Sequence, residues 1–188
     1  MPTEREKMLA GELYRAADPE LSALRARCRD LLYAFNHSRE SEADLRRTLL
    51  QELLGAGGDT AWIEPPFYCD YGGNIALGRN VYMNFNCVIL DVAPVTIGSG
   101  VLFGPAVQVY TATHPLNYHD RASGQEYGKP ITIGDGTWIG GSAVILPGVR
   151  IGARTVIGAG AVVTKDMPDD VFAAGNPCQV LRELEQGG

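Results

Sequence analysis

Residues 131–166 decide the fold, and in blocks of six they read ITIGDG, TWIGGS, AVILPG, VRIGAR, TVIGAG and AVVTKD. The third place of every block is aliphatic: Ile133, Ile139, Ile145, Ile151, Ile157 and Val163. A helix repeats its apolar residues at about 3.6 and a simple strand at about 2, so each block predicts one short strand followed by a tight turn. Three such blocks make a triangular coil of roughly 18 residues, and stacked coils form a parallel β-helix.

Glycine follows the aliphatic residue in four of the six blocks, as Gly134, Gly140, Gly152 and Gly158. Glycine suits a corner that needs either a positive φ or close backbone approach. The aliphatic side chains are predicted to point inward, where only stacking on the next coil can bury them.

The same spacing extends toward the N-terminus. Coils are predicted to begin near Gly73, with inward residues at Leu77, Met83, Ile89, Ile97, Phe103 and Val109 and a shift of two residues around Asp91 to Val95. Residues 112–130 lack the aliphatic series, and Ile133 lies 24 residues after Val109, a multiple of six. We therefore predict a loop that projects from a corner of the coil, which is where functional residues commonly lie. An exit turn and a short tail are expected after Asp166.

Residues 1–58 differ in composition, since they hold 19 of the 38 formal charges. Thr3 with Glu6 fits a capping box, and Asp18 before Pro19 fits an N-cap followed by proline. Leucine stripes then predict two helices, the second beginning at Ser41 and carrying an apolar side of Leu45, Leu49, Leu50, Leu53 and Leu54. We expect an N-terminal α-helical subdomain at 1–58 and a β-helix domain at 59–188.

Composition narrows the functional classes. A net charge of −6 gives no electrostatic basis for binding nucleic acid or an anionic membrane. No apolar run is long enough to span a membrane, and the charged N-terminus lacks the apolar core of a signal peptide. The four cysteines, at 28, 69, 87 and 178, form no CxxC pair and are expected to be free thiols in a cytoplasmic protein.

The projecting loop holds the first candidate for chemistry. His114 lies where the rigid coil ends, and its ordinary pKa near 6.5 suits a general base close to neutral pH; the alternative is a surface histidine. With His119 it could also indicate zinc, but a zinc site needs a third protein ligand, and the remaining histidine, His37, falls in the helical segment.

Other candidates lie on the coils. Asn84 stands where a corner glycine is expected and could simply adopt a left-handed conformation, or its amide could face a cleft. Asp70, Tyr71 and Tyr82 could hold a polyol. Thr164, Lys165 and Arg182 place hydroxyl and cationic groups near the last coil, where they either meet an anionic phosphate or are solvated.

The whole chain resembles the maltose and galactoside O-acetyltransferases, which belong to the hexapeptide-repeat acyltransferases. The resemblance is carried by EREKMLAGELYRAADPEL, LLYAFNHS, the segment from EPPFYCDYGG to NFNCVILD, YTATHPL, the hexad series and VVTKDMPDDVFAAGNPCQVLREL. AGELYRAAD, CDYG and YTATHP favour the maltose branch.

The resemblance implies a left-handed β-helix and a homotrimer with active sites between neighbouring subunits. It implies transfer of an acetyl group from acetyl-CoA to a sugar hydroxyl, in particular the 6-hydroxyl of maltose- or glucose-type acceptors. The implied reaction requires no metal ion. His114 would be the base and Asn84 the amide that supports the transition state. The implied acceptor residues are Asp70, Tyr82, Asn84, Arg25 and Glu126, and the implied CoA residues are Gly141, Ala159, Thr164, Lys165 and Arg182. The backbone N–H near Gly141 is a further oxyanion candidate.

Two positions depart from the galactoside enzymes. Val92 follows Asp91 where those enzymes have a second acid, and Gln179 replaces an arginine. The alternatives left open are another sugar acceptor such as a galactoside, a zinc enzyme similar to the β-helix carbonic anhydrases, and a non-catalytic scaffold.

Overall fold

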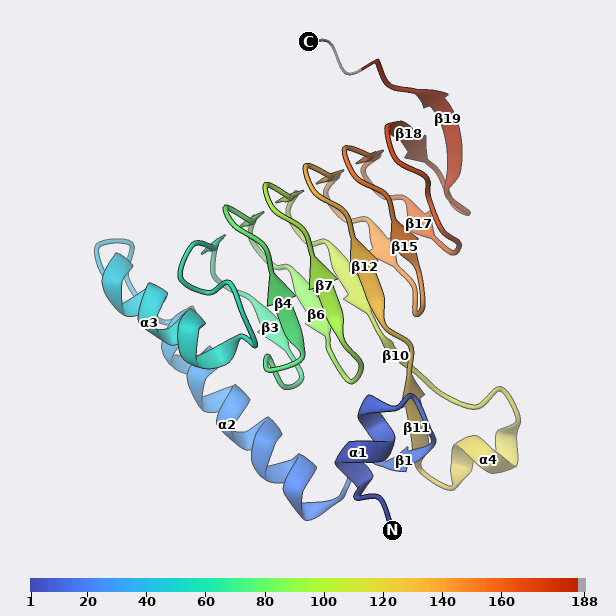
Figure 1. The fold of residues 1–188 in the computed structure, drawn as a ribbon. Helices are drawn as coiled ribbons and strands as arrows, with labels where there is room; N and C mark the ends of the chain where they lie inside the picture. The colour runs from blue at the N-terminus through green and yellow to red at the C-terminus, as the bar shows by residue number, and fades with distance from the viewer. Residues whose placement is uncertain (186–188) are drawn as a thin grey trace.

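The structure is a computed structural model that describes residues 1–185, and it is a left-handed parallel β-helix with helices at one end (Figure 1). Its coils form three faces. Face 1 has four strands: β4 (Ile75–Leu77), β7 (Val95–Ile97), β12 (Ile131–Ile133) and β15 (Arg150–Ile151). Face 2 starts with five parallel strands: β2 (Trp62–Ile63), β5 (Tyr82–Met83), β8 (Leu102–Phe103), β13 (Trp138–Ile139) and β16 (Val156–Ile157). Face 3 has five: β3 (Tyr68–Cys69), β6 (Val88–Leu90), β9 (Gln108–Tyr110), β14 (Val144–Ile145) and β17 (Val162–Val163).

The hexad residues face inward, as predicted. All six aliphatic residues from Ile133 to Val163 are at most 1% exposed, and the earlier series from Leu77 to Val109 is also buried. A second inward position lies two residues earlier and holds smaller side chains, such as Thr137, Ala143 and Ala161. Each hexad therefore buries two side chains, and in most hexads the earlier one is the smaller.

The corner glycines serve close approach and not positive φ. A Cβ on Gly140 would lie 2.5 Å from the backbone nitrogen of Ala159 in the next coil. Positive φ occurs two residues further on, for example at Ser142 (φ 60°) and Gly160 (φ 69°). The first of the two reasons proposed for these glycines is therefore wrong at these positions, and the second is confirmed.

The coil begins earlier than predicted. β2 and β3 already pair in register with β5 and β6, so the segment around Pro65 and Pro66 is the first coil and not an entry segment. The prolines interrupt the aliphatic series and hide this coil from the sequence. After the projecting loop the coil resumes in phase, because Ile133 pairs with Ile97.

Two helices close the open N-terminal end of the prism. α2 (Pro19–Asn36) begins at the Asp18 cap, whose carboxylate accepts from the backbone N–H groups of Glu20 and Leu21. α3 (Ala43–Leu53) begins at Glu42 without a side-chain cap, so the predicted Ser41 cap is wrong, and Leu45 is 44% exposed instead of buried. Most buried residues of α2 and α3 belong to one hydrophobic cluster with the first coils, namely Cys28, Leu32, Phe35, Leu50 and Leu53, which gives the repeat its capping layer. The division into 1–58 and 59–188 stays a prediction.

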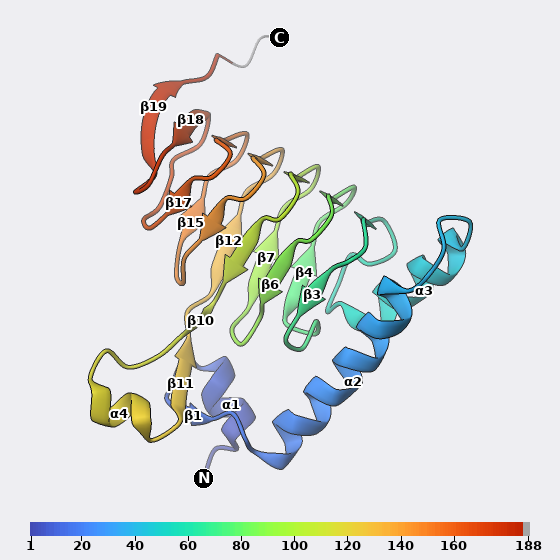
Figure 2. The same cartoon turned by 180° about the vertical axis from the view of Figure 1, so that it is seen from behind.

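The projecting loop is a short antiparallel arm beside the N-terminus (Figures 1 and 2). β10 (Ala112–Thr113) pairs with β11 (Gln125–Gly128), and α4 (Tyr118–Ala122) lies between them. β1 (Tyr14–Arg15) pairs with the other edge of β11, and α1 (Glu4–Leu9), which has the predicted Thr3–Glu6 capping box, packs beside it. A small separate cluster of Met8, Tyr14, Leu21 and Val92 joins these segments.

The chain ends in a hairpin, where only a turn and a tail were expected. β18 (Val171–Ala174) continues face 2 in parallel with β16, and β19 (Gln179–Glu183) returns antiparallel along it. Residues 186–188, the end of the predicted tail, lie outside the described residues.

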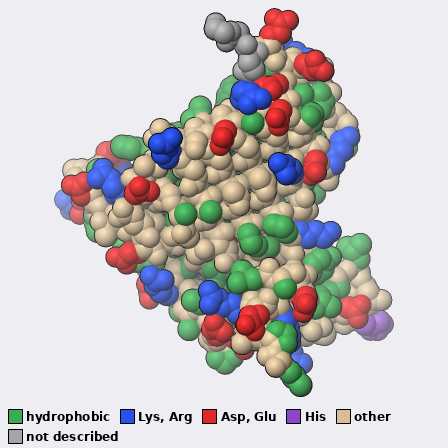
Figure 3. All heavy atoms as spheres, in the orientation of Figure 1, with side chains coloured by type: hydrophobic (Ala, Val, Ile, Leu, Met, Phe, Trp, Pro, Cys, Tyr) green, Lys and Arg blue, Asp and Glu red, His purple; other side chains and the backbone are tan. Residues whose placement is uncertain are grey.

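The three faces differ in the side chains that point outward. Face 1 carries a row of small, polar and charged side chains, which are Ala76, Thr96, Thr132 and Arg150. Face 2 carries an apolar row of Trp62, Tyr82, Leu102, Trp138, Val156 and Phe172. Face 3 carries Tyr68, Val88, Gln108, Val144 and Val162. On the side of the molecule drawn in Figure 3, charged side chains are scattered over the coils between wide areas of polar side chain and backbone.

The four cysteines are free thiols, and the sulfurs of Cys28 and Cys69 lie 3.6 Å apart. Within residues 1–185, none of the helices has both the length and the apolar character that a membrane span requires.

Candidate functional site

His114 lies directly after β10, at the root of the arm, on the edge where the chain turns from face 3 to face 1 (the 3/1 edge). Pro115 follows it and favours an extended backbone at His114. The imidazole is 54% exposed, and its Nε2 lies 3.8 Å from the Oε2 of Glu126 on β11. The imidazole and this carboxylate therefore lie side by side at the root of the arm.

Glu126 is held from its other side by the N-terminal strand. Its Oε1 accepts a hydrogen bond from the hydroxyl of Tyr14, and Tyr14 is directly opposite Glu126 in the β1–β11 pairing. Burial and the Glu126 carboxylate raise the pKa of Tyr14 above its ordinary value, so the phenol stays protonated and donates. The carboxylate side chain is 19% exposed. Sequence reasoning missed Tyr14, because no local pattern links it to a residue more than a hundred positions away.

Asp70 lies on the same 3/1 edge, one residue after β3. Burial, followed by the negative charges of Asp91 and Glu126, raises the pKa of Asp70 to about 6. The guanidinium groups of Arg25 and Arg29 act in the opposite direction. This carboxylate is therefore costly to keep charged in the folded protein.

Arg25 connects α2 to this group. It donates to the hydroxyl of Tyr71 at 2.7 Å, to the Ala16 carbonyl at 2.6 Å and to the Ser22 hydroxyl at 3.2 Å, and its guanidinium lies 5.7 Å from the centre of the Tyr71 ring. These contacts fix the cation beside Asp70. The structure thus brings together four residues predicted from the sequence: His114, Glu126, Asp70 and Arg25.

Asp91 supports the same edge from inside the protein. It is fully buried and accepts backbone hydrogen bonds from Asp70 (3.0 Å), Tyr71 (2.9 Å) and Asn74 (3.3 Å). Burial raises the pKa of Asp91, and these donors oppose the increase. The shift of two residues in the repeat falls at this carboxylate, which organises two successive turns.

Asn84 and Tyr82 lie elsewhere, on or beside the edge where face 2 turns into face 3 (the 2/3 edge). Asn84 does not adopt a positive φ, so the left-handed corner considered for it is wrong; Asn86 has that conformation. The side-chain oxygen Oδ1 of Asn84 accepts from the backbone N–H of Phe85 at 2.7 Å. The amide therefore presents its Nδ2 hydrogens, the donors that a developing oxyanion needs.

Four of the five residues predicted for CoA divide between the same two edges, and Arg182 lies on β19 beside face 2. Gly141 and Ala159 follow face 2 strands and lie on the 2/3 edge with Asn84, and the carbonyl of Gly141 accepts from Gly160. Thr164 and Lys165 follow β17 and lie on the 3/1 edge with His114. Lys165 donates to the Gln179 side chain at 3.0 Å, and Arg182 stacks over the Phe172 ring at 5.8 Å.

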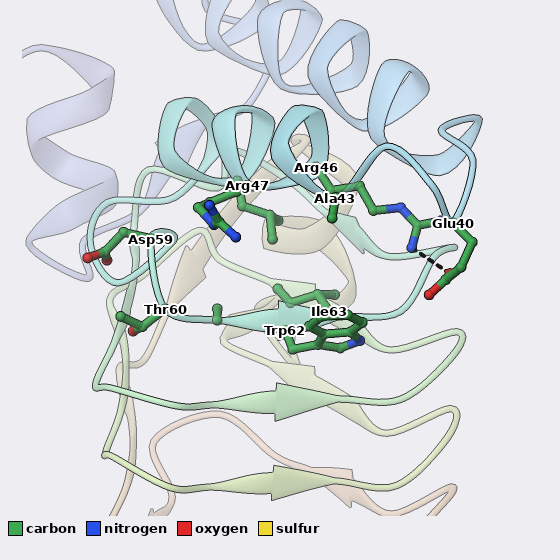
Figure 4. Close-up of a pocket in the computed structure, with 10 residues that line it drawn as sticks. Glu40, Ala43, Arg46, Arg47, Asp59, Thr60, Trp62 and Ile63 are labelled. Carbon is green, nitrogen blue, oxygen red and sulfur yellow. Dashed lines mark hydrogen bonds and ion pairs between the residues drawn. The ribbon is translucent and has the colours of Figure 1, made fainter.

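Two cavities are formed near the helices, and of the site residues predicted from the sequence Tyr71 alone lines either of them, the second. One of about 160 Å³ lies between α3 and β2, where Arg46 is paired with Glu40 beside the Trp62 ring (Figure 4). The other, of about 240 Å³, lies between α1, α2 and the first coils. The candidate groups instead occupy two open edges of the prism, separated by face 3.

His119 lies on α4 and packs edge-on against Tyr118, with ring centres 5.4 Å apart. Within the described part of the chain, no three His, Cys, Asp or Glu side chains are placed to hold a metal ion together.

Comparisons with known proteins cover both parts of the chain. Residues 7–58 match the maltose acetyltransferase hexapeptide capping motif, and residues 130–165 match the bacterial transferase hexapeptide family of six repeats. The chain is 48% identical over 179 residues to the galactoside O-acetyltransferase of Escherichia coli K12, which covers 95% of this chain and 88% of that protein.

Solved structures agree with this likeness. A maltose O-acetyltransferase from Clostridium difficile 630 superposes with a TM-score of 0.97 at 46% identity, covering 98% of this chain and 99% of the other. A galactoside acetyltransferase in complex with coenzyme A superposes with a TM-score of 0.94 at 47% identity, covering 98% and 92%.

Proposed function

The chain belongs to the maltose and galactoside O-acetyltransferase family, an enzyme family that uses acetyl-CoA, and we propose that it acetylates the 6-hydroxyl of maltose- or glucose-type sugars. The observation that carries this proposal is the cluster of His114, Glu126, Asp70 and Arg25 on one edge of a hexapeptide β-helix. No metal is needed for the reaction that these groups support.

His114 acts as the general base in direct transfer. Its imidazole removes the proton from the sugar hydroxyl as the hydroxyl oxygen attacks the thioester carbonyl. The tetrahedral intermediate collapses, the C–S bond breaks, and the imidazolium returns the proton to the CoA sulfur. Glu126, 3.8 Å from the ring, favours the imidazolium that forms between these steps. The Asn84 amide, with the backbone N–H near Gly141, stabilises the oxyanion.

Asp70, Arg25 and Glu126 bind the acceptor. Sugar hydroxyls both donate and accept hydrogen bonds, so carboxylates and a guanidinium on one edge suit them. Tyr82 contributes from face 2. Val92 packs beside Tyr14 in the small apolar cluster. An acidic residue at this position, as in the galactoside enzymes, would have no partner within that cluster. The valine therefore supports a maltose-type acceptor over a galactoside.

The active site forms between copies of the chain. Asn84 and Gly141 lie on the 2/3 edge, whereas His114 and Lys165 lie on the 3/1 edge. These groups can act on one thioester only if the 2/3 edge of one copy meets the 3/1 edge of the next. A homotrimer with face 3 toward the threefold axis achieves this with one heterologous contact repeated three times, and outward apolar residues on faces 2 and 3 support it.

Acetyl-CoA lies along the contact between the 2/3 edge of one copy and the 3/1 edge of the next (the seam). It lies beside Gly141, Ala159 and Thr164, with Lys165 and Arg182 near its phosphates. Lys165 is 3.0 Å from Gln179, so the glutamine can orient the cation but adds no charge of its own. We assign the protein to the cytoplasm, where acetyl-CoA is available and thiols stay reduced.

The decisive experiment compares His114→Ala with His119→Ala, a histidine of the same arm that lies on α4. Loss of a general base typically lowers turnover about 10²–10⁴-fold, so His114→Ala should lose this much while His119→Ala keeps its activity. Thiol release from acetyl-CoA is followed with glucose, maltose and a galactoside, with and without a metal chelator. A folded His114→Ala trimer with near-normal turnover, or activity lost to the chelator, refutes the mechanism.

A further inference from the structure

Tyr14 is the one tyrosine among the described residues that is completely buried, and it is buried with its hydroxyl in use. The ring packs in the small cluster with Met8, Leu21 and Val92, and the hydroxyl donates to Glu126. The acceptor is a carboxylate, and hydrogen bonds to charged groups are among the stronger ones in proteins. A simple packing role does not require this hydroxyl, because phenylalanine would fill the same space.

The hydrogen bond spans three strands that converge on His114. β1 carries Tyr14, β11 carries Glu126, and β10 ends one residue before His114. Tyr14 is paired directly with Glu126, so the phenol reaches the carboxylate from a fixed backbone position. One carboxylate oxygen, Oε1, faces the phenol, and the other, Oε2, faces the imidazole at 3.8 Å.

We propose that Tyr14 is a positioning residue for the reaction: it holds the Glu126 carboxylate in the rotamer that directs Oε2 toward His114. The inference rests on the proposed role of His114 and extends it to the N-terminal segment. That segment then contributes to catalysis as well as covering the end of the coil.

The physical basis is that Glu126 lies near a second carboxylate. Asp70 is close enough that the charge of Glu126 contributes to raising the pKa of Asp70. A carboxylate side chain beside a like charge is driven to rotate away from it unless a donor holds it. Arg25 engages Tyr71, Ala16 and Ser22, and the phenol of Tyr14 is the donor bonded to Glu126.

Tyr14→Phe tests the hydroxyl alone, since it preserves the buried ring. We expect kcat to fall about tenfold at neutral pH, the size of losing one hydrogen bond to a charged group. The KM for acetyl-CoA should not change. Leu21→Val is the matched control, because it loosens the same cluster without touching the hydrogen bond; it should lower the melting temperature and leave kcat unchanged.

A double-mutant cycle with Glu126→Gln identifies the route. If Tyr14 acts through Glu126, then Tyr14→Phe should cost less than twofold in the Glu126→Gln background. Equal losses in both backgrounds, wild-type kcat in Tyr14→Phe, or the same loss of kcat in Leu21→Val would overturn the inference. The His114→Ala variant separates this inference from the proposed function. If His114→Ala keeps full turnover, both the proposed role of His114 and the role of Tyr14 are refuted. If His114→Ala loses turnover but Tyr14→Phe has no effect, only the role of Tyr14 is refuted.

Discussion

Replacing Asp70 with asparagine should stabilise the protein at neutral pH while impairing its use of the acceptor. The substitution keeps the shape of the side chain and removes its charge. Burial and two neighbouring carboxylates raise the pKa of Asp70 to about 6, against an ordinary value of 3.8. Among the described residues, no side chain or backbone group donates a hydrogen bond to this carboxylate, so asparagine loses no partner.

The size of the effect follows from the difference in pKa. The folded state binds the Asp70 proton more tightly than the unfolded chain does. The contribution of Asp70 to the free energy of unfolding is therefore greatest below pH about 4 and falls as the pH rises through about 6. The full difference corresponds to about 3 kcal/mol, and partial exposure reduces this to about 2 kcal/mol. For a chain of this size, such a change raises the melting temperature by roughly 4–8 °C.

Thermal melts of wild type and Asp70→Asn at pH 4 and pH 8 measure this directly. The variant should be more stable at pH 8 and equal to wild type at pH 4. Asp44→Asn, at an exposed position on α3, is the matched control and should show no such difference. A gain of the same size at both pH values, or none at pH 8, would refute the reasoning. A raised KM for the sugar in the same variant would identify Asp70 as a residue whose charge is retained for binding at the expense of stability.

Two further predictions address the coil and the seam. Gly140→Ala should destabilise the protein by about 1–3 kcal/mol, because its Cβ would lie 2.5 Å from a backbone nitrogen that cannot move independently; Gly73→Ala, which meets nothing within 4 Å, should be nearly neutral in the same denaturation assay. Separately, Asn84→Ala and His114→Ala should each be inactive, yet refolding them together in equal amounts should restore about a quarter of wild-type activity, the fraction of seams that receive both intact residues by chance in a closed ring. Absence of any recovery would place both residues in sites within a single chain.

The sequence by itself determined the architecture, because a hexad period has few structural solutions. The aliphatic residues from Ile133 to Val163 recur at a fixed interval and predict layers of inward-facing side chains. Stacking of the coils is the only way to bury these side chains. Local signals likewise placed α1 and α2 through Thr3 and Asp18. Where the local signal was weak, at Ser41 and at the first coil with its two prolines, the prediction was wrong, because pairing with neighbouring coils and helices decides those segments.

The tertiary structure alone decided which candidates lie together. It grouped Asp70, Arg25 and Glu126 with His114 on one edge and placed Asn84 on another, although all had equal standing as motifs. It also added Tyr14, whose hydroxyl meets Glu126 across an antiparallel pairing of distant strands. Periodicity determines whether each residue of a coil faces inward or outward. A contact between the N-terminal strand and the arm depends instead on where these two segments leave the repeat. The hexad spacing carries no information about the positions of those two segments.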